Sequence, residues 1–419
     1  MLGYLNNLQP KGMIDYEETK SQPITRIMVW QAYKIVKANK GSHGVDNMSW
    51  EYLDLNLKTE LYKLWNRLTS GSYFPQAVRQ VSIPKKDGGV RNLGIPTLLD
   101  RIAQQVAKSH LEKSVEPIFS SNSFGYRPNR SGHDAVIQAC NNSCKYDFVI
   151  DLDIKGFFDN IDHKLLLKAV EHYCKEKWIL LYVERWLKAG VVEVDGNYKS
   201  TFTGTPQGGV ISPLLANIYL HVVLDGWMWK HYPDVPFERY ADDVVVHCRT
   251  EKQAQEILKA INNRMQECLL TLHPVKTKIV NIGGHPTKQY ARSYDFLGFT
   301  IKPNIAKVKT ELKAIPRVFV SRKSKNAIYE KFRDLQIHKK RKPIESIAME
   351  LNTKIRGMIN YYHKFGNSSM RIVWQGLNMR LLKWVRWEKK LSKLEAIKWL
   401  KRKHAENPYL FNHWILVHP

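Results

Sequence analysis

Three aspartates carry the strongest chemical signal in the sequence. Asp153 ends a stretch in which apolar residues alternate with carboxylates, the pattern of a strand with one buried face. Asp242 and Asp243 are adjacent and lie between two short strand-like runs further along the chain. If these strands pair, three carboxylates converge, and hard oxygen ligands in that arrangement suit Mg²⁺. Two such ions would serve phosphoryl transfer.

Two alternatives accompany this interpretation. Adjacent aspartates in a turn are usually solvated turn formers, so Asp242 and Asp243 by themselves are weak evidence for a metal site. Asp151 lies on the same predicted strand face as Asp153 and competes with it for the position of a ligand. Because like charges avoid one another unless a cation neutralises them, the neighbouring motifs must decide.

The elements that position these aspartates follow from the hydrophobic period and the turn residues. Apolar spacing predicts helices over residues 24–70, and residues 78–95 predict a β-hairpin. Asp100 is predicted to cap the next helix, which should stop near Pro117 because proline disfavours a helical residue before it. Strands interleaved with helices predict an α+β or α/β catalytic half.

Two further features concern helices. Ser212 before Pro213 is the typical start of a helix, with serine as the N-cap and proline in the first turn. From about residue 316 to the C-terminus the pattern becomes helical, with basic residues around one apolar face. Four tryptophans there could stack on bases, but at helical spacing they are more often core residues: Trp374, Trp384, Trp387 and Trp399.

The charge distribution points to a polyanionic partner. The 419 residues carry 65 Lys and Arg against 39 Asp and Glu, a net charge of +26. Residues 302–419 alone hold 28 basic and 8 acidic residues. Such an excess exceeds what solubility requires, so the last quarter of the chain is predicted to bind nucleic-acid phosphates.

Other classes of protein are excluded at this stage. No apolar run approaches the ~20 residues of a membrane helix, and the N-terminus lacks a signal peptide pattern. We therefore expect a cytoplasmic, nucleic-acid-associated protein that makes no membrane contact. Five scattered cysteines form no disulfide framework, and Cys140 with Cys144 has no second ligand pair for structural zinc.

The segment Tyr240–Asp243 resembles the active-site box of bacterial group II intron-encoded reverse transcriptases and maturases. Ile355–Tyr362 resembles the maturase, or thumb, motif of the same proteins. Leu410–Trp414 resembles the C-terminal ending of some bacterial members. Five further motifs occur in the order expected of the family: Ile83–Arg91, Phe124–Arg130, Asp153–Asp159, Thr205–Gly209 and Leu297–Phe299. A set of ordered motifs is far more specific than any one of them.

The resemblance implies a right-hand polymerase of the α+β class. Residues 1–78 would form an N-terminal extension and the start of the fingers, and residues 79–300 the fingers and palm. Residues 301–419 would form a basic helical thumb and C-terminal tail. The expected activity is RNA-directed DNA polymerisation by two-metal nucleotidyl transfer, combined with binding of intron RNA as a maturase.

The resemblance also assigns roles to the acidic residues. It implies two Mg²⁺ ions, with Mn²⁺ as a substitute, held by three carboxylates and one backbone carbonyl: Asp153, Asp242, Asp243 and Ile154. It favours Asp153 over Asp151, because the family places an aromatic residue five positions after the first metal-binding aspartate. Phe158 lies five positions after Asp153. In the family this aromatic packs under the incoming sugar and would reject a 2′-hydroxyl. Phe157 is expected to be a core residue.

The resemblance also implies which residues contact the nucleotide, the template and the primer. The expected nucleotide ligands, besides Phe158, are Lys85, Arg91, Gln207 and Lys276. The expected template and primer contacts are Arg127, Arg130, Phe296, Leu297 and Gly298. Residues 40–46 resemble the N-terminal extension that covers the template. Solvated basic residues, tight glycine turns and a helix-to-helix loop are the alternatives for these segments.

The expected partners are structured RNA such as an intron, an RNA template with a DNA primer, and dNTPs. Two alternatives remain open: an RNA-binding maturase whose polymerase site is incidental, and a domesticated reverse transcriptase in phage defence or repair. Because the sequence shows no Cys/His cluster of an endonuclease domain, we expect neither that domain nor an RNase H domain. We therefore expect a primer from another source, such as a nascent DNA strand.

Overall fold

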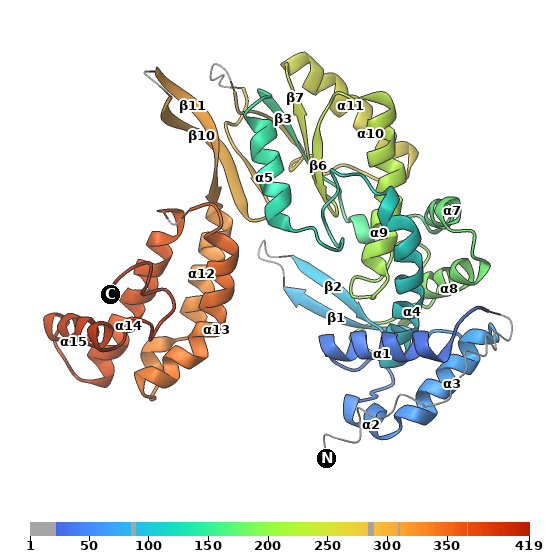
Figure 1. Ribbon diagram of the computed structural model, residues 1–419, viewed down its shortest axis with the longest axis horizontal. Helices are drawn as coiled ribbons and strands as arrows, with labels where there is room; N and C mark the ends of the chain where they lie inside the picture. Colours follow the sequence, from blue (N-terminus) through green and yellow to red (C-terminus); the bar gives the residue numbers. More distant parts are fainter. Residues whose placement is uncertain (1–21, 85–88, 284–288, 309–310, 367) are drawn as a thin grey trace. The chain divides into compact units, whose positions relative to one another are not determined.

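The computed structural model describes residues 22–84, 89–283, 289–308, 311–366 and 368–419 (Figure 1). The chain divides into two compact units, each assembled from several segments. Unit 1 comprises residues 1–128, 154–233 and 261–272. Unit 2 comprises residues 129–153, 234–260 and 273–419. The division into extension, fingers and palm, and thumb at residues 78 and 300 remains a prediction.

Unit 1 begins with the helices expected over residues 24–70. They are α1 (Arg26–Asn39), α2 (Trp50–Leu55) and α3 (Leu57–Thr69). The hydroxyl of Thr25 accepts a hydrogen bond from the Met28 N–H at 3.2 Å and so caps α1. The helix ends before Gly41, which has a positive φ of 119°.

The predicted hairpin is confirmed by β1 (Val78–Pro84) and β2 (Val90–Ile95), which pair in antiparallel register. Two short strands, β4 (Val191–Val192) and β5 (Tyr198–Lys199), complete a sheet in the order β2-β1-β4-β5. The other unit 1 helices follow in chain order: α4 (Leu98–Val115), η1 (Glu116–Ile118), α6 (Phe157–Asn160), α7 (His163–Tyr173), α8 (Lys177–Leu187), α9 (Ser212–Leu220), η2 (His221–Asp225) and α10 (Gly226–His231).

Both predicted helix caps are wrong. Thr97 caps α4, and its hydroxyl accepts from the Asp100 N–H at 3.1 Å. Asp100 is instead buried and accepts hydrogen bonds from the hydroxyls of Tyr73 and Thr97. Burial raises the pKa of Asp100 to about 6. Ser212 is the first residue of α9, and its Oγ lies 2.8 Å from the Thr205 hydroxyl. In both cases the side chain that the local sequence pattern predicts as a helix cap forms a hydrogen bond elsewhere in the fold.

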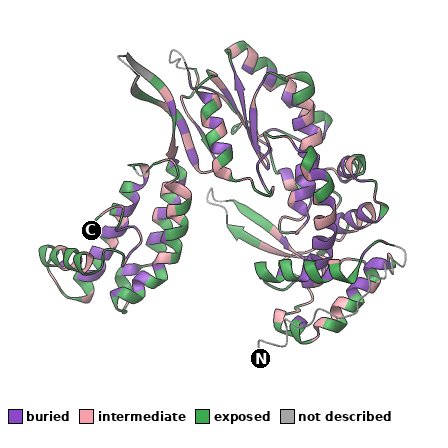
Figure 2. Cartoon of the chain, viewed as in Figure 1, coloured by how far each residue is buried: buried purple, intermediate pink, exposed green. Residues whose placement is uncertain are grey.

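The central sheet of unit 2 has the strand order β6-β7-β3-β8. Its strands are β6 (Phe237–Tyr240), β7 (Asp243–Cys248), β3 (Phe148–Asp153) and β8 (Lys278–Asn281). Val244, Val245 and Val246 are fully buried, as the purple β7 in Figure 2 shows. Helix α5 (Gly132–Ser143) contacts β6 and β7, and α11 (Glu251–Glu267) follows β7 in the chain.

A second sheet in unit 2 has the order β11-β10-β9, and the sequence analysis predicted none of its strands. It consists of β9 (Tyr294–Phe296), β10 (Phe299–Val308) and β11 (Glu311–Val320). The helical pattern expected from residue 316 therefore starts later, at Arg322. Pro303 faces Pro316 across the hairpin, and proline belongs at strand edges because it cannot donate to a ladder.

Helices form the rest of unit 2: α12 (Arg322–Asp334), η3 (Ile337–Lys339), α13 (Ile344–Tyr362), η4 (Ser368–Met370), α14 (Arg371–Glu388) and α15 (Lys393–Glu406). Trp374 and Trp384 are buried, which confirms the core alternative for these two residues. Trp387 is 47% exposed, with the Arg341 guanidinium 3.5 Å above its ring. All five cysteines are free. Within the described ranges, no helix is both long and apolar enough to cross a membrane.

The C-terminal tail is fastened to α14 by a buried polar network. The Asn378 Oδ1 atom lies 2.8 Å from His413 Nε2 and accepts from the Trp414 indole at 3.1 Å. The Asn378 amide donates to the carbonyls of Val417 and His418. His413 is fully buried, and this burial lowers its pKa to about 3.

This histidine predicts an acid-sensitive tail. The unfolded chain protonates His413 near pH 6.5, whereas the folded chain resists protonation until about pH 3, so stability is lost as the pH falls below 6.5. Between pH 7.5 and 5, wild type should lose about 2 kcal/mol more unfolding free energy than His413→Gln. Urea unfolding at both pH values measures this, and equal losses would contradict it. His404, whose pKa is also lowered, is present in both proteins and cancels.

Candidate active site

The strand pairing in unit 2 brings the predicted acidic residues together. β3 and β7 are antiparallel, and their register places Asp153 directly opposite Asp243. Asp242 precedes Asp243 in the tight turn that joins β6 to β7, because Tyr240 pairs with Asp243 across that turn. The prediction that the two strands pair is confirmed, so the three carboxylates lie at one end of one sheet.

The turn between β6 and β7 is held in a strained conformation. Ala241 has a φ of +56°, in the left-handed region that non-glycine residues rarely adopt. The buried Arg239 donates from Nη1 to the Ala241 carbonyl at 3.2 Å and helps to fix the turn. Residues in this region cluster at functional sites, where the surrounding structure enforces them.

A second turn holds the backbone of Asp153. The Asp153 carbonyl accepts from the His273 N–H at 2.7 Å and from the Thr277 hydroxyl at 3.3 Å. The Thr277 Oγ1 also accepts from the Asp153 N–H at 3.2 Å. Lys276, in the same turn, places Nζ 3.3 Å from Asp153 Oδ2. The predicted nucleotide ligand Lys276 is thus beside a predicted metal ligand.

Burial and mutual repulsion perturb the acids at this end of the sheet. Desolvation, followed by the charges of Asp151 and Asp242, raises the pKa of Asp243 to about 8. Desolvation also raises the pKa of Asp151 to about 6, although Lys278 Nζ lies 3.6 Å from its Oδ2. Asp151 therefore has a cationic partner in the fold, whereas Asp243 is surrounded mainly by other carboxylates.

This donor set fits hard divalent cations. Carboxylate oxygens are the ligands that such ions prefer. The raised pKa of Asp243 reflects its burial first and then the negative charges of Asp151 and Asp242, which a cation would compensate. In the described part of the chain, no three His, Cys, Asp or Glu side chains stand close enough to hold an ion alone. Further ligands would come from substrate phosphate and water, as is usual for Mg²⁺.

The predicted primer turn contacts the same acidic residue. The Leu297 N–H hydrogen-bonds to the Asp243 carboxylate. Leu297 and Gly298 have φ values of +50° and +83°, so the link between β9 and β10 is a tight turn. Helices α12 and α13 hold this turn, because the Tyr361 hydroxyl donates to the Leu297 carbonyl at 2.8 Å and the Ser324 hydroxyl to the Gly298 carbonyl at 2.9 Å.

The predicted nucleotide contacts Phe158 and Gln207 come together in unit 1. Phe157 is 2% exposed, as expected for a core residue, and the half-buried Phe158 ring lies 5.3 Å from it. The Phe158 carbonyl accepts from the Thr205 N–H at 2.8 Å. Gln207 donates from Nε2 to Asp159 Oδ1 at 3.4 Å. The two segments therefore form one local structure.

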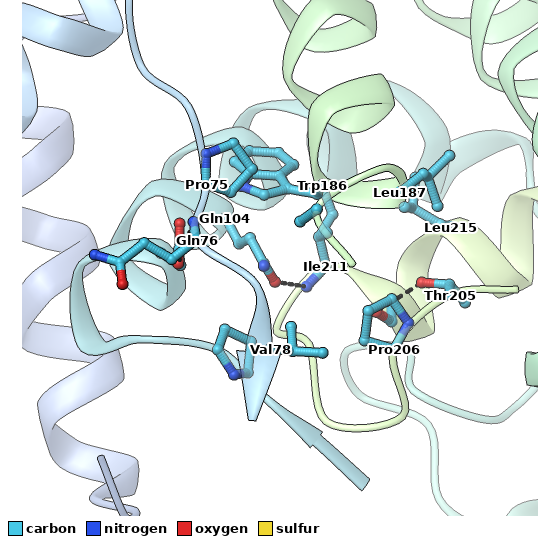
Figure 3. Close-up of a pocket in the computed structure, with 14 residues that line it drawn as sticks. Pro75, Gln76, Val78, Gln104, Trp186, Leu187, Thr205, Pro206, Ile211 and Leu215 are labelled. Atoms are coloured by element: carbon cyan, nitrogen blue, oxygen red, sulfur yellow. Dashed lines mark hydrogen bonds between the residues drawn. The ribbon is translucent and has the colours of Figure 1, made fainter. Parts of the chain in front are cut away.

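Gln104 supports the loop that carries Gln207, and sequence analysis missed it. Its Oε1 accepts from the Val210 N–H at 2.8 Å. It also lies 3.4 Å from the Ile211 N–H, the contact drawn in Figure 3. A polar residue that is 5% exposed in an apolar helix must satisfy its hydrogen bonds inside the fold. Polar residues at buried helix positions, such as Gln104 and Arg101, were the signal available in the sequence.

The remaining predicted site residues lie on other segments of the chain. Arg91 is exposed on β2 and pairs with Ile83 on β1. Lys85 lies outside the described residues. Ile154 follows Asp153, is buried, and forms a bridge with Leu272.

Comparison with known families adds to this geometry. Residues 83–301 match the family "Reverse transcriptase (RNA-dependent DNA polymerase)". The chain belongs to the reverse transcriptase family. Residues 325–416 match the group II intron maturase-specific domain. The predicted family, enzyme class and right-hand polymerase fold are confirmed.

Curated relatives are of the same kind. Protein YkfC of Escherichia coli K12 is 34% identical over 294 residues, which cover 60% of this chain and 76% of the relative. The group II intron-encoded protein LtrA of Lactococcus lactis is 38% identical over 191 residues, which cover 45% of this chain but 32% of LtrA. A telomerase structure from Candida albicans has a TM-score of 0.47 and 14% identity, and covers 84% of this chain and 67% of that one.

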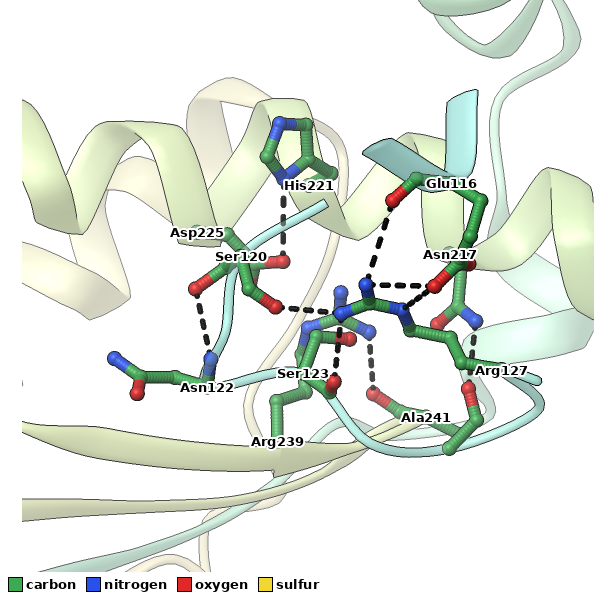
Figure 4. Close-up of polar contacts among 11 residues, drawn as sticks. Glu116, Ser120, Asn122, Ser123, Arg127, Asn217, His221, Asp225, Arg239 and Ala241 are labelled. Carbon is green, nitrogen blue, oxygen red and sulfur yellow. Dashed lines mark hydrogen bonds and ion pairs between the residues drawn. The ribbon is translucent and has the colours of Figure 1, made fainter. Parts of the chain in front are cut away.

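The Arg127 side chain of this reverse transcriptase forms its ion pair and hydrogen bonds inside unit 1. Its guanidinium forms an ion pair with Glu116 at 2.8 Å and donates to the carbonyls of Ser120 and Ser123 (Figure 4). The side chain is 5% exposed. We therefore do not carry forward the template contact predicted for Arg127. Arg130 is half-buried in unit 2, and its template contact stays a prediction.

Proposed function

We propose that this reverse transcriptase extends a DNA primer on an RNA template by using dNTPs. The observation that carries the proposal is the register that sets Asp153 opposite Asp243, with Asp242 in the adjoining turn. These residues and the Ile154 carbonyl would hold two Mg²⁺ ions, with Mn²⁺ as a substitute. Bound there, the ions would supply activation of the primer 3′-hydroxyl and stabilisation of the leaving pyrophosphate.

The remaining residues would bind and orient the substrates. Lys85, Arg91 and Gln207 would contact the nucleotide, and Phe158 would exclude a 2′-hydroxyl from the sugar pocket. Lys276 would neutralise negative charge beside Asp153. The turn Phe296–Gly298 would support the primer end, since its backbone is bonded to both Asp243 and the thumb helices.

The test is DNA synthesis on a primed RNA template with Mg²⁺, read as full-length product. Extension that depends on RNA template, dNTPs and divalent cation is the expected result. A chain that binds the primed template but adds no nucleotide with either Mg²⁺ or Mn²⁺ would contradict the proposal. It would favour an RNA-binding maturase with an incidental polymerase site.

We also propose that the basic thumb binds structured intron RNA. The match to the maturase-specific domain and the 28 basic residues after position 301 favour this partner. Each phosphate contact contributes about 0.9 to the slope of log affinity against log salt on duplex. Replacing Lys383 and Arg386 on α14, and Lys390 just after it, by Gln should therefore lower the slope by about 2 to 3.

Filter binding of a group II intron RNA at KCl concentrations from roughly 50 to 400 mM measures this slope. Lys252→Gln is the matched control, because Lys252 is 86% exposed on α11, outside the maturase-specific region. An equal fall in slope for the control, or no fall for the triple variant, would place the RNA contacts elsewhere.

A further inference from the structure

Two histidine side chains meet where the C-terminal tail of unit 2 returns to α15. His404 lies in the last turn of α15, and His418 follows it 14 residues later in the tail. His404 Nε2 lies 3.1 Å from His418 Nδ1, and the ring centroids are 4.7 Å apart. His418 is exposed and His404 is half-buried, so solvent reaches the pair. The function described above uses neither residue.

The separation of the two nitrogens is that of two ligands on one metal ion. Zn²⁺ and related ions bind imidazole nitrogen at about 2.0–2.1 Å, so two nitrogens that share an ion lie roughly 2.8 to 3.4 Å apart at bond angles of about 90 to 110°. The observed distance of 3.1 Å falls inside this range. A hydrogen bond between the two rings has a similar length, and it is the contact that an ion would replace.

Both histidines are held by the same pair of buried residues. The Trp414 ring packs edge-to-face against His404, with the ring centroids 5.6 Å apart. The Trp414 indole donates to Asn378 Oδ1 at 3.1 Å, and the Asn378 amide donates to the His418 carbonyl at 3.1 Å. Trp414 is fully buried and Asn378 is 8% exposed. The fold therefore brings the two imidazoles together before an ion arrives, which lowers the entropic cost of binding.

The local charges also permit a cation at this position. Histidine binds metal as the neutral imidazole. Burial, followed by the charge of His418, lowers the pKa of His404, so this ring is neutral at neutral pH. The neighbouring Lys403 would repel a cation, but its ammonium is paired with Glu406 at 3.0 Å and Glu345 at 3.8 Å. The nearest positive charge is therefore offset by two carboxylates.

We propose that His404 and His418 together bind one divalent transition-metal ion such as Zn²⁺, which fastens the C-terminal tail to the end of α15. In the part of the chain that the structure describes, no third His, Cys, Asp or Glu side chain completes the ligand set, so water fills the remaining positions. Imidazole selects Zn²⁺, Cu²⁺ and Ni²⁺, whereas carboxylates select Mg²⁺. This site is therefore chemically distinct from the acidic site at Asp153.

The test is calorimetric titration of the untagged full chain with Zn²⁺ in excess Mg²⁺, which competes for the carboxylates. Wild type should bind one Zn²⁺ more tightly than any other. His404→Gln and His418→Gln should each weaken this binding about tenfold or more, since even the loss of an outer-shell partner costs that much at metal sites. Equal Zn²⁺ affinity in wild type and both variants would overturn the inference.

His172→Gln is the matched control, because the chain has 15 histidines and single imidazoles also bind Zn²⁺. His172 is exposed on α7 in unit 1, so its substitution should leave the tightest binding unchanged. A loss as large as that of His404→Gln would show that scattered histidines bind the ion, and the inference would fail. Thermal unfolding in EDTA verifies folding. Should His404→Gln not fold, the exposed His418→Gln decides the question alone.

Two further measurements identify the ligands and locate the ion. Electron paramagnetic resonance of bound Cu²⁺ should show two imidazole nitrogens in wild type and fewer in His418→Gln, and an unchanged spectrum would contradict the proposal. Zn²⁺ should slow amide hydrogen exchange at the end of α15 and in the tail of wild type alone. Protection confined to other segments would also overturn it. Neither measurement involves nucleotide addition, so their outcome is independent of the proposed function.

Discussion

Asp243→Asn should abolish DNA synthesis, by on the order of 10³-fold or more, without unfolding the protein. The substitution keeps the shape of the side chain and removes the charge that a divalent cation requires. Burial already raises the pKa of this carboxyl to about 8, so a neutral amide suits the folded environment at least as well. We expect an unchanged or higher melting temperature. Asp153→Ala and Asp242→Ala should likewise lose extension while binding RNA normally.

Asp151→Asn is the matched control for this prediction. Asp151 shares the strand and the face with Asp153, but it is paired with Lys278. Its loss should reduce the extension rate by less than about tenfold, since it is not a predicted cation ligand. Single-turnover primer extension on saturating duplex measures all four variants. Full activity of Asp243→Asn, or a larger defect in Asp151→Asn than in Asp153→Ala, would reverse the assignment.

Phe158→Ala should admit ribonucleotides. The backbone of Phe158 is fixed by the hydrogen bond from Thr205, so truncation removes the ring and leaves the loop in place. A steric filter of this kind acts through contacts worth a few kcal/mol, so selectivity for dCTP over CTP should fall about 10²-fold. The measurement is the ratio of kcat/KM values for the two nucleotides opposite a template G.

Phe157→Leu provides the comparison. Phe157 is fully buried against Phe158, so its truncation should lower stability while leaving the selectivity ratio nearly unchanged. A selectivity ratio that persists in Phe158→Ala would remove its gating role. A ratio that falls equally in both variants would indicate that packing of the pair, and not the Phe158 ring, sets the filter.

The sequence predicted the structure best where carboxylate side chains fall on one face of an alternating strand pattern. The alternation that ends at Asp153 predicted both the strand and the acidic face, and the pairing with Asp243 followed. Local patterns failed where a distant residue competed for a side chain. Aspartate is a common helix-capping residue, but the Asp100 carboxylate instead accepts a hydrogen bond inside the core from the hydroxyl of Tyr73, 27 residues earlier.

The β10–β11 hairpin shows a different limit. Its lysines and prolines weaken every strand signal, because these residues are rare inside sheets. They are tolerated since β11 is an edge strand and β10 pairs with β9 only through residues 299–301. Which strand forms an edge depends on the completed topology.

The contacts of the primer turn restrict how the enzyme can be engineered. A version truncated after Val320 would retain Asp153, Asp242 and Asp243 and all strands of the central sheet. It would nevertheless lose the hydroxyls of Ser324 and Tyr361, which hold the carbonyls on either side of the turn that donates to Asp243. The maturase region is therefore not a detachable module: a minimal polymerase built on this scaffold must carry α12 and α13 with it.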